Sequence, residues 1–426
     1  MQGLALGLLL SACGNPDTDP QPDPACVSLT DDVSWFRGNA SNDWNDVHID
    51  AQGRIWLAGY ADGTLGATTI EPSGNSRGVL RQLAPDGRVL WDSASTFDTP
   101  GTDVIEALAV SPQGQVVVAG RSTGAFGGGS NAGQFDTFVA QGDPAQATPG
   151  WAWLQAGNAA PQRPRRVVLS ASGEIAIAGY DDVFIPTNYL EAPPDPFLLR
   201  LRSTGTPAAL QLRWQHQLGT QRSDVASAVA TAPDGTTWFA FSAESGPERG
   251  IHLRRLDAAG QTMWTQRYTT VGLDNIVALH PQPDGTLWMA GTAHGSFDGQ
   301  PAVGLGAVFL ARVAGDDGRV LHSWRYGSGT ADWLTDMAID GQGNFVLFGE
   351  TVGSWIPGQP SAGQTDLFLL RVSPTGKRLA MRQWGTADDE VAGRVALDAC
   401  GNAVAVGSST VTATRQRSGL MWFWRT

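Results

Sequence analysis

A column of polar residues recurs along this chain at a constant distance from a repeated glycine. Each member stands eleven residues before a glycine that closes a short turn, and five of the seven members are acidic. The seven are Asn42, Asp103, Gln162, Asp224, Asp274, Asp332 and Glu390. Carboxylates gathered around one end of a channel would form an acidic rim that attracts a cation or a basic partner. The alternative, which we favour, is that each side chain caps its own loop through backbone N–H groups.

Two of the six histidines also share a repeat position, because His48 and His280 each stand five residues before a turn glycine. The other repeats carry Ala or Val at that position. The two imidazoles could face a common channel, or each could fill a roomier position in its wall, which is the interpretation that we favour. The HExxH, CxxC and Gly-x-Ser-x-Gly motifs are absent from the sequence. The strong sequence signals for metalloproteases and serine hydrolases are therefore missing.

Two stretches of the sequence resemble repeats that are found in enzymes built from repeated β-sheets. The stretch 232–238 resembles the Asp-box of sialidase-like enzymes, but Asp234 and Gly235 are adjacent, whereas the box places a residue between them. The stretch 85–91 resembles repeats of quinoprotein-type enzymes, which need a quinone pocket and a Ca²⁺ cage of oxygen ligands. Neither an adjacent cysteine pair nor a clustered ligand set is found in the sequence. We therefore expect no catalytic residues, no cofactor and no metal. The alternative is an enzyme located at the cell envelope.

The net charge of the chain disfavours two kinds of binding partner, nucleic acid and the surface of an anionic membrane. The formal net charge is −13 at pH 7, and a phosphate backbone requires a basic footprint. The same charge disfavours peripheral docking to anionic lipid. Nucleic acid is thus not an expected partner.

The amino end predicts export. Residues 1–12 form a short apolar run that ends in small residues, which is typical of a secretory signal peptide. The stretch 10–13 resembles a bacterial lipobox, so we expect Cys13 to carry the lipid that anchors the protein to a membrane. Residues 13–29 are rich in Pro and Asp, and this composition predicts an extended tether. An ordinary signal peptide with an incidental cysteine is the alternative.

A unit of near-constant length organises the rest of the chain. The turn glycines are Gly53, Gly114, Gly173, Gly235, Gly285, Gly343 and Gly401. Subtraction of residue numbers gives intervals of 61, 59, 62, 50, 58 and 58 residues. Each unit contains four strand-like runs, of which the first, second and third are exemplified by 335–339, 116–120 and 366–372. Seven such units predict an all-β fold, a seven-bladed β-propeller with four antiparallel strands per blade.

The fourth strand of each unit holds one tryptophan, and the phase of these residues predicts how the ring closes. They are Trp35, Trp91, Trp153, Trp214, Trp264, Trp324 and Trp384. Trp35 precedes the first turn glycine, while the chain ends on a third strand at 420–426. We therefore expect residues 33–36 to complete the last blade, within one domain of residues 30–426. The tryptophans are expected to pack between blades, and a row of exposed carbohydrate contacts is the alternative.

Several segments resemble the bacterial seven-bladed β-propeller (SBBP-type) repeat. The resemblance rests on 363–376, on 383–386, and on an Asp-x-Phe pattern in strand three, as in Asp366 and Phe368. It spans about residues 30–426, and the fourth blade departs most because Phe241 stands where every other unit has a second glycine, six residues after its turn glycine. The resemblance implies a propeller fold and an extracytoplasmic setting.

The remaining cysteines, Cys26 and Cys400, are expected to form a disulfide, because an exported protein meets an oxidising compartment. Cys400 lies in the turn between the first two strands of the last blade. Cys26 lies seven residues before Val33, where the closing strand should begin. The crossing needs about three strand spacings, near 14 Å, and seven extended residues reach on the order of 23 Å. Two unrelated buried thiols are the alternative.

These observations predict a monomeric, exported, lipid-anchored propeller that acts as a non-catalytic binding or scaffold protein at the cell envelope. Its expected location is extracytoplasmic, as an outer-membrane lipoprotein. The expected partners are the membrane, through the lipid, and an envelope protein or polysaccharide. An outer-membrane assembly factor is an alternative among binding proteins, and an enzyme acting on polysaccharide or small substrates is the alternative from another class.

Overall fold

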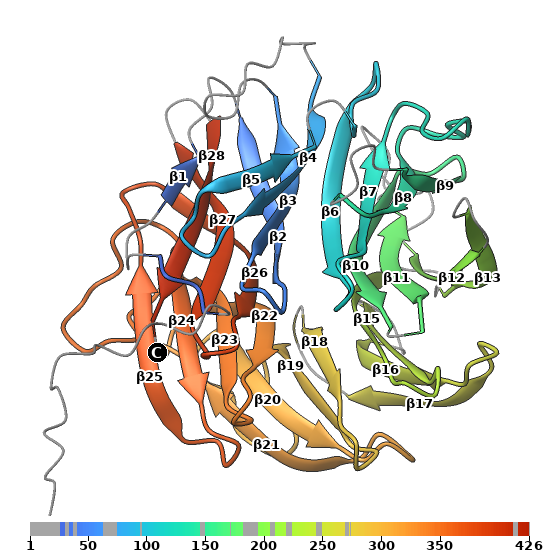
Figure 1. The fold of residues 1–426 in the computed structure, drawn as a ribbon. Helices are drawn as coiled ribbons and strands as arrows, with labels where there is room; N and C mark the ends of the chain where they lie inside the picture. The colour runs from blue at the N-terminus through green and yellow to red at the C-terminus, as the bar shows by residue number, and fades with distance from the viewer. Residues whose placement is uncertain are drawn as a thin grey trace, which may run out of the picture.

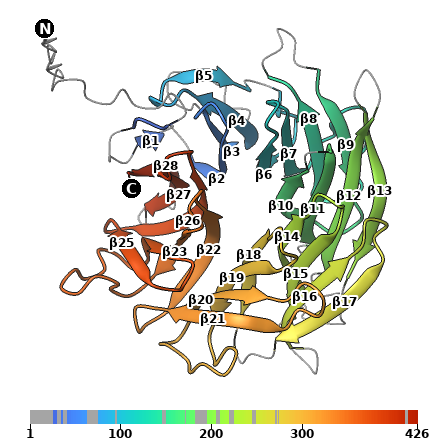
Figure 2. The ribbon, with the colours of Figure 1, turned by 60° about the horizontal axis from the view of Figure 1, so that its bottom comes forward.

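Seven four-stranded antiparallel sheets follow one another around a central axis (Figure 1, Figure 2). The computed structural model describes residues 26–29, 34–36, 41–62, 75–93, 96–144, 150–170, 172–181, 195–204, 209–218, 224–243, 249–268, 272, 274–411 and 416–425. Every named element within these residues is a strand. The predicted seven-bladed β-propeller with four strands per blade is confirmed. Within the same residues, no helix is long and apolar enough to cross a membrane.

Each blade is numbered in chain order and runs from the axis outward. The inner strands are β2 (Asn42–Ile49), β6 (Asp103–Val110), β10 (Gln162–Leu169), β14 (Asp224–Thr231), β18 (Asn275–Pro281), β22 (Asp332–Ile339) and β26 (Asp389–Leu397). The second strands are β3 (Ile55–Ala61), β7 (Val116–Ser122), β11 (Glu174–Asp181), β15 (Thr237–Ala243), β19 (Leu287–Ala293), β23 (Phe345–Thr351) and β27 (Ala403–Val411). The third strands are β4 (Arg77–Leu83), β8 (Asp136–Gly142), β12 (Pro196–Thr204), β16 (Gly250–Leu256), β20 (Ala307–Val313), β24 (Asp366–Val372) and β28 (Gln416–Trp424). The outer strands are β5 (Val89–Asp92), β9 (Ala152–Ala156), β13 (Ala209–Gln217), β17 (Thr262–Tyr268), β21 (Val320–Tyr326), β25 (Arg378–Trp384) and β1 (Ser34–Phe36).

Blade 7 contains strands from both ends of the chain, in the order β1-β28-β27-β26. Ser34 pairs with Met421 and Phe36 pairs with Gly419, antiparallel. Figure 2 shows β1, in blue, beside β28, in red. The predicted closure is confirmed for Ser34–Phe36, while Val33 lies outside the described residues. A propeller closed in this way leaves only short sheet edges.

The core is distributed between the blades rather than gathered in one centre. The described residues form seven buried apolar clusters, and each cluster joins two neighbouring blades. The cluster between blades 7 and 1 contains Val406 and Phe423 on one side and Trp44 and Leu57 on the other. Because the joint that closes the ring is packed like the other six, burial of apolar area holds the ring together at that point too.

Turns between the first and second strands depend on a capped glycine. In blade 6 the Oδ1 atom of Asp340 accepts hydrogen bonds from the N–H groups of Gln342 and Asn344, at 2.9 and 2.8 Å. Gly343 adopts a φ of 81°, a left-handed conformation that glycine accepts at little cost. These turns and the turns between third and fourth strands lie on one side of the ring, which we call the turn face. The opposite side, where the inner strands begin, is the loop face.

Three outer-strand tryptophans pack against the turn of the next blade. The indole Nε1 of Trp214 donates to the carbonyl of Ala258 at 3.2 Å, and that of Trp264 donates to Gly315 at 3.1 Å. A Cβ atom added to Gly376 would collide with the indole of Trp324. These three tryptophans therefore pack between blades. Trp35 lies in β1, but its side chain is not described.

Candidate functional site

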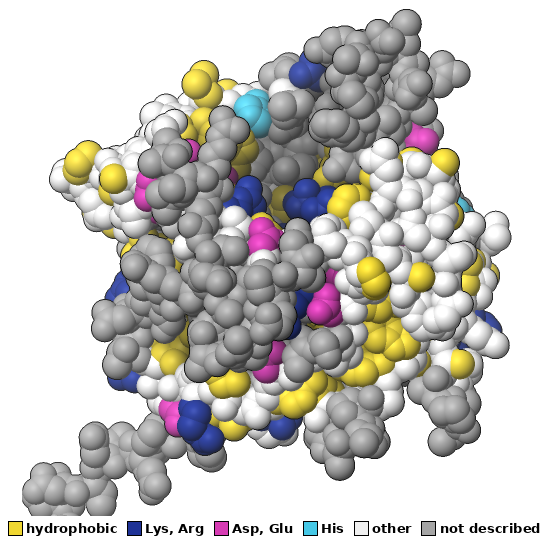
Figure 3. Space-filling view, turned by 90° about the horizontal axis from the view of Figure 1, so that it is seen from above, with side chains coloured by type: hydrophobic (Ala, Val, Ile, Leu, Met, Phe, Trp, Pro, Cys, Tyr) yellow, Lys and Arg dark blue, Asp and Glu magenta, His cyan; other side chains and the backbone are white. Residues whose placement is uncertain are grey.

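The axis of the ring contains two cavities separated by a layer of charged side chains. The loop-face cavity has a volume of about 340 Å³ and takes residues from all seven blades. The turn-face cavity has a volume of about 500 Å³. Figure 3, a view from above, shows Lys and Arg side chains in a central hollow, with Asp and Glu side chains near them.

A β-bulge in each inner strand aims a side chain into the loop-face cavity. Every inner strand loses register with its neighbour after its first few residues. The residues skipped by the pairing are Asn45, Glu106, Arg165, Ser227, Val277, Thr335 and the pair Gly393 and Arg394. All of them line the loop-face cavity. A bulge re-aims a side chain and is common beside functional sites, so this column marks the cavity as the candidate site.

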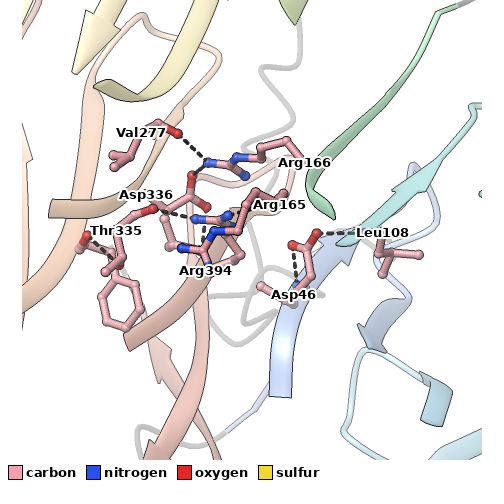
Figure 4. A network of polar contacts seen from close by, with 11 residues as sticks. Asp46, Leu108, Arg165, Arg166, Val277, Thr335, Asp336 and Arg394 are labelled. Carbon is pink, nitrogen blue, oxygen red and sulfur yellow. Dashed lines mark hydrogen bonds and ion pairs between the residues drawn. The ribbon is translucent and has the colours of Figure 1, made fainter. Parts of the chain in front are cut away.

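The charged layer below this cavity consists of Asp46, Arg166, Asp336 and Arg394 (Figure 4). Arg166 of blade 3 pairs with the carboxylate of Asp336 on blade 6 and donates to the carbonyl of Val277 at 3.1 Å. Asp46 accepts the N–H of Leu108 at 2.8 Å. The layer thus joins blades on opposite sides of the axis.

Arg394 is the cation of this layer that faces the loop-face cavity. Its guanidinium donates to the carbonyls of Thr335, at 2.6 Å, and of Arg165, at 3.0 Å. Burial and the neighbouring Arg166 together lower the pKa of Arg394 to about 9, against the opposing effects of Asp336 and Asp46. Arg394 is still a cation near neutral pH.

Three carboxyl groups line the loop-face cavity, and each already has a partner. Asp43 pairs with Arg417 at 3.0 Å, and burial raises the pKa of Asp43 to about 6 against the opposing effect of Arg417. Glu350 accepts the N–H of Ala392 at 2.8 Å, and burial raises its pKa to about 7.

Glu106 is the third carboxyl group, and its pKa is shifted in the opposite direction, below its usual value. Its carboxylate lies 2.8 Å from Arg121 and 3.2 Å from Arg163. Burial alone would raise the pKa of Glu106, but Arg163 and Arg121 outweigh it and hold the pKa below its usual value. Glu106 is therefore an anion near neutral pH, paired with Arg163 and Arg121 and also influenced by the charge of Arg165.

The turn-face cavity contains the two histidines that share a repeat position. His48 and His280 both line it, among side chains that include Leu108, Val168 and Met337. Burial lowers the pKa of His48 to about 4 and also lowers that of His280. Both imidazoles are therefore neutral near pH 7 and contribute no charge to the cavity.

The described residues of the predicted acidic rim bond to their own loops. Asp103 accepts the N–H of Thr99 at 2.6 Å, and Asp332 accepts the N–H of Ser328 at 2.7 Å. Asp274 accepts the N–H of Gly272, and Glu390 accepts that of Thr386. These contacts are those of local caps, whereas the attraction of a cation by such a rim stays a prediction. Asp224 begins β14, but its side chain is not described.

No group of three or more His, Cys, Asp or Glu side chains that could hold a metal ion occurs in the part of the chain that the structure describes. The sequence reasoning missed the bulge column. Each of its members stands eight residues before a turn glycine, beginning with Asn45 and Glu106, except Arg394, which stands seven residues before Gly401. The same repeat alignment that revealed the rim could therefore have found it.

The cysteines fall into two groups. Cys26 and Cys400 form a disulfide with Cα atoms 5.7 Å apart, which supports the predicted pairing. The carboxylate of Asp398 reinforces the junction, since it accepts the N–H of Val27 at 2.7 Å and the N–H of Cys400 at 2.9 Å. Cys13, the predicted signal peptide and most of the tether lie outside the described residues.

No family model and no curated protein matches the sequence. Among solved structures, the chain is similar to Sqt1 from Chaetomium thermophilum, with 13% identity, a TM-score of 0.49, and coverage of 93% of this chain and 90% of that one. It is similar to a glucose dehydrogenase with 15% identity, a TM-score of 0.39, and coverage of 75% and 96%. It is also similar to the GH74 xyloglucanase from Xanthomonas campestris, with 11% identity, a TM-score of 0.45, and coverage of 92% and 55%. Likenesses at this distance carry no inference about activity.

Proposed function

We propose that this protein is an exported, lipid-anchored propeller that binds a ligand non-catalytically at the cell envelope, with the loop-face cavity as its binding site. The observation that carries the proposal is the bulge column, which turns residues of seven blades toward one cavity of about 340 Å³. Cavities that bind small molecules have volumes of about 300–1,000 Å³ and a few convergent polar groups. The cavity has a volume in that range, and its lining is mostly polar and charged, which suits a polar ligand.

The contacts of the carboxyl groups favour binding over catalysis. Asp43 holds Arg417, Glu106 holds two arginines, and Glu350 holds a backbone N–H group. A general acid or base must reach the substrate proton within hydrogen-bond distance. Carboxyl groups that already bridge neighbouring strands are better suited to keeping the wall rigid than to exchanging protons with a ligand.

The envelope setting rests on the amino end and on the repeat. The apolar run of residues 1–12, the lipobox-like stretch that ends at Cys13 and the SBBP-type resemblance each favour export. The disulfide between Cys26 and Cys400 is consistent with an oxidising compartment.

The test compares the wild-type protein with a variant whose cavity is filled. Ser227 lines the cavity, so Ser227→Trp should exclude a ligand. Met263 has 54% of its surface exposed, and Met263→Trp is the matched control. Envelope polysaccharide fractions and small-molecule extracts are applied to the immobilised proteins, and bound material is analysed by mass spectrometry. We expect a component that the wild type and Met263→Trp retain unchanged and that Ser227→Trp loses. Equal retention by all three proteins contradicts the proposal.

An enzyme is the second candidate, because two carboxyl groups with raised pKa values line the same cavity. Glu350, with a pKa of about 7, is partly protonated near neutral pH, and Asp43, with a pKa of about 6, is mostly ionised there, so the two could act as an acid and a base. The mass spectrometry above separates the candidates, since an enzyme would release a chemically altered component. Asp43→Asn or Glu350→Gln should then abolish that alteration.

A further inference from the structure

We infer that the loop-face cavity binds a saccharide that carries a single carboxylate, with Arg165 as the residue that receives the negative group. The inference rests on the proposed function and names the chemical class of its ligand. Free sugar acids such as glucuronate are the simplest members of that class.

Arg165 differs from the other arginines that line the cavity. Arg163 pairs with Glu106 at 3.2 Å, and Arg417 pairs with Asp43 at 3.0 Å. The side chain of Arg165 has no hydrogen bond or ion pair with any residue in the described ranges, although its backbone carbonyl accepts from Arg394. The half-buried guanidinium of Arg165 is influenced by the charge of Glu106 but forms no direct bond with that carboxylate, so its donors remain available to a ligand carboxylate.

A second cation lies directly beneath Arg165. The acceptors of Arg394 are the backbone carbonyls of Thr335 and Arg165, which are neutral. Burial lowers the pKa of Arg165, and repulsion by Arg163 and Arg166 lowers it further against the opposing effects of Tyr180 and Glu106. An anion bound at Arg165 would relieve this repulsion. A planar carboxylate matches a guanidinium through two parallel hydrogen bonds.

The remaining wall suits a sugar ring. Trp333 is half-buried and lines the cavity together with Val225. The indole offers a flat apolar surface on which the C–H face of a sugar can pack. Asn45 and Asn275 also line the cavity. The Nδ2 of Asn45 donates to the carbonyl of Ile105 and the Oδ1 of Asn275 accepts the N–H of Thr292, so the amide oxygen of Asn45 and the amide donors of Asn275 can serve hydroxyl groups.

The charge balance limits the ligand to one negative charge. Asp43, Glu106 and Glu350 line the same cavity and would repel a polyanion. Arg163 and Arg417 are already engaged with carboxylates, which leaves Arg165 as the guanidinium that lacks a protein partner among the described residues. A monocarboxylate therefore fits better than a phosphate dianion.

The experiment measures binding of glucuronate, glucose and inorganic phosphate to the full-length protein by calorimetry and by ligand-observed NMR. We expect glucuronate to bind about tenfold or more tightly than glucose or phosphate, as a charge-assisted hydrogen bond predicts. Arg165→Met should lose most of that preference, whereas Arg165→Lys should retain part of it. Arg319, which is exposed and distant from the cavity lining, supplies the matched control Arg319→Met.

Three results would overturn the inference. They are equal affinity for glucose and glucuronate, phosphate binding as tight as glucuronate binding, and glucuronate binding that Arg165→Met leaves unchanged. Should Arg165→Met fail to fold, Arg165→Lys and Trp333→Leu decide, because both must weaken glucuronate binding. Retention of a different envelope component that Ser227→Trp loses would leave the proposed function intact while refuting this ligand class.

Discussion

The guanidinium of Arg394, on the inner strand of blade 7, donates a hydrogen bond of 3.0 Å to the carbonyl of Arg165, on the inner strand of blade 3. The two residues are 229 positions apart in the chain. Together with the ion pair of Arg166 and Asp336, which joins blades 3 and 6, this contact spans the axis. The channel of this propeller is therefore closed by its own side chains, and the loop-face cavity has a floor.

Loss of Asp336 should destabilise the protein strongly. Asp336 pairs with Arg166 and accepts the N–H of Val395 at 3.0 Å, so Asp336→Leu leaves a buried cation and a buried donor without partners. We expect the free energy of unfolding to fall by about 3–5 kcal/mol in urea titrations. The double variant Arg166→Met/Asp336→Leu should recover part of that loss. A loss below about 1 kcal/mol for Asp336→Leu would show that the pair contributes little.

Two turn glycines should respond differently to the same substitution. Gly114 and Gly376 have φ values of 85° and 80°, but only at Gly376 would an added Cβ collide, with the indole of Trp324. Gly114→Ala should cost about 1–2 kcal/mol, which is the backbone cost alone. Gly376→Ala should cost roughly 1–3 kcal/mol more because of overpacking at the joint between blades 5 and 6. Thermal unfolding of both variants measures the difference, and equal losses would contradict a packing role for Trp324.

The disulfide should stabilise the closed ring. Cys26 and Cys400 are separated by 374 residues, so the bond restricts the unfolded chain over nearly its whole length. Cys26→Ser, Cys400→Ser or chemical reduction should each lower the free energy of unfolding by about 2–5 kcal/mol. Reduction of the Cys26→Ser variant is the control and should have no further effect. Free thiols at both positions in protein recovered without reductant would contradict the pairing.

Titration of Glu350 should make stability depend on pH. Burial raises its pKa from 4.5 to about 7, so the folded state holds the proton more tightly than the unfolded state. The stabilisation of the folded state by this protonated carboxyl group is complete below about pH 4.5 and is lost as the pH rises through about 7. Glu350→Gln removes the titration while keeping an acceptor for Ala392. The variant should therefore gain about 1–3 kcal/mol at about pH 8 and show a flatter profile from about pH 4.5 to 7. An unchanged profile would refute this account.

The lipid anchor can be tested directly at Cys13. Each buried CH₂ group of an acyl chain contributes about 0.8 kcal/mol to membrane binding, so a multiply acylated cysteine would hold the protein firmly. Cys13→Ala should move the protein from the membrane fraction to the soluble extract or block its processing. Cys26→Ser, which removes a different cysteine, should leave the fractionation unchanged. Membrane association that persists in Cys13→Ala would refute the anchor.

Strand boundaries illustrate the limit of sequence reasoning. The alternation of apolar residues predicts a first strand at 335–339, whereas β22 begins at Asp332. The bulge between Leu334 and Asp336 shifts the side-chain phase, so the residues before it do not continue the pattern. In this blade the periodicity is therefore visible only on the turn-face side of the bulge. For the same reason the polar residues of the bulges did not stand out as a site.

The sequence by itself determined the number of blades and the closure of the last blade by β1, because both follow from a local repeat and its phase, which any single unit reveals when it is compared with the next. It also predicted the pairing of Cys26 with Cys400, from the expected export together with the position of the closing strand. Only the tertiary structure decided which side chains meet on the axis. Arg165, Asp336 and Arg394 lie in three different units, and although the repeat alignment places them at neighbouring positions of their units, it does not indicate which of them meet across the axis. Their contacts arise because the ring brings the inner strands of non-adjacent blades within hydrogen-bond distance across its centre.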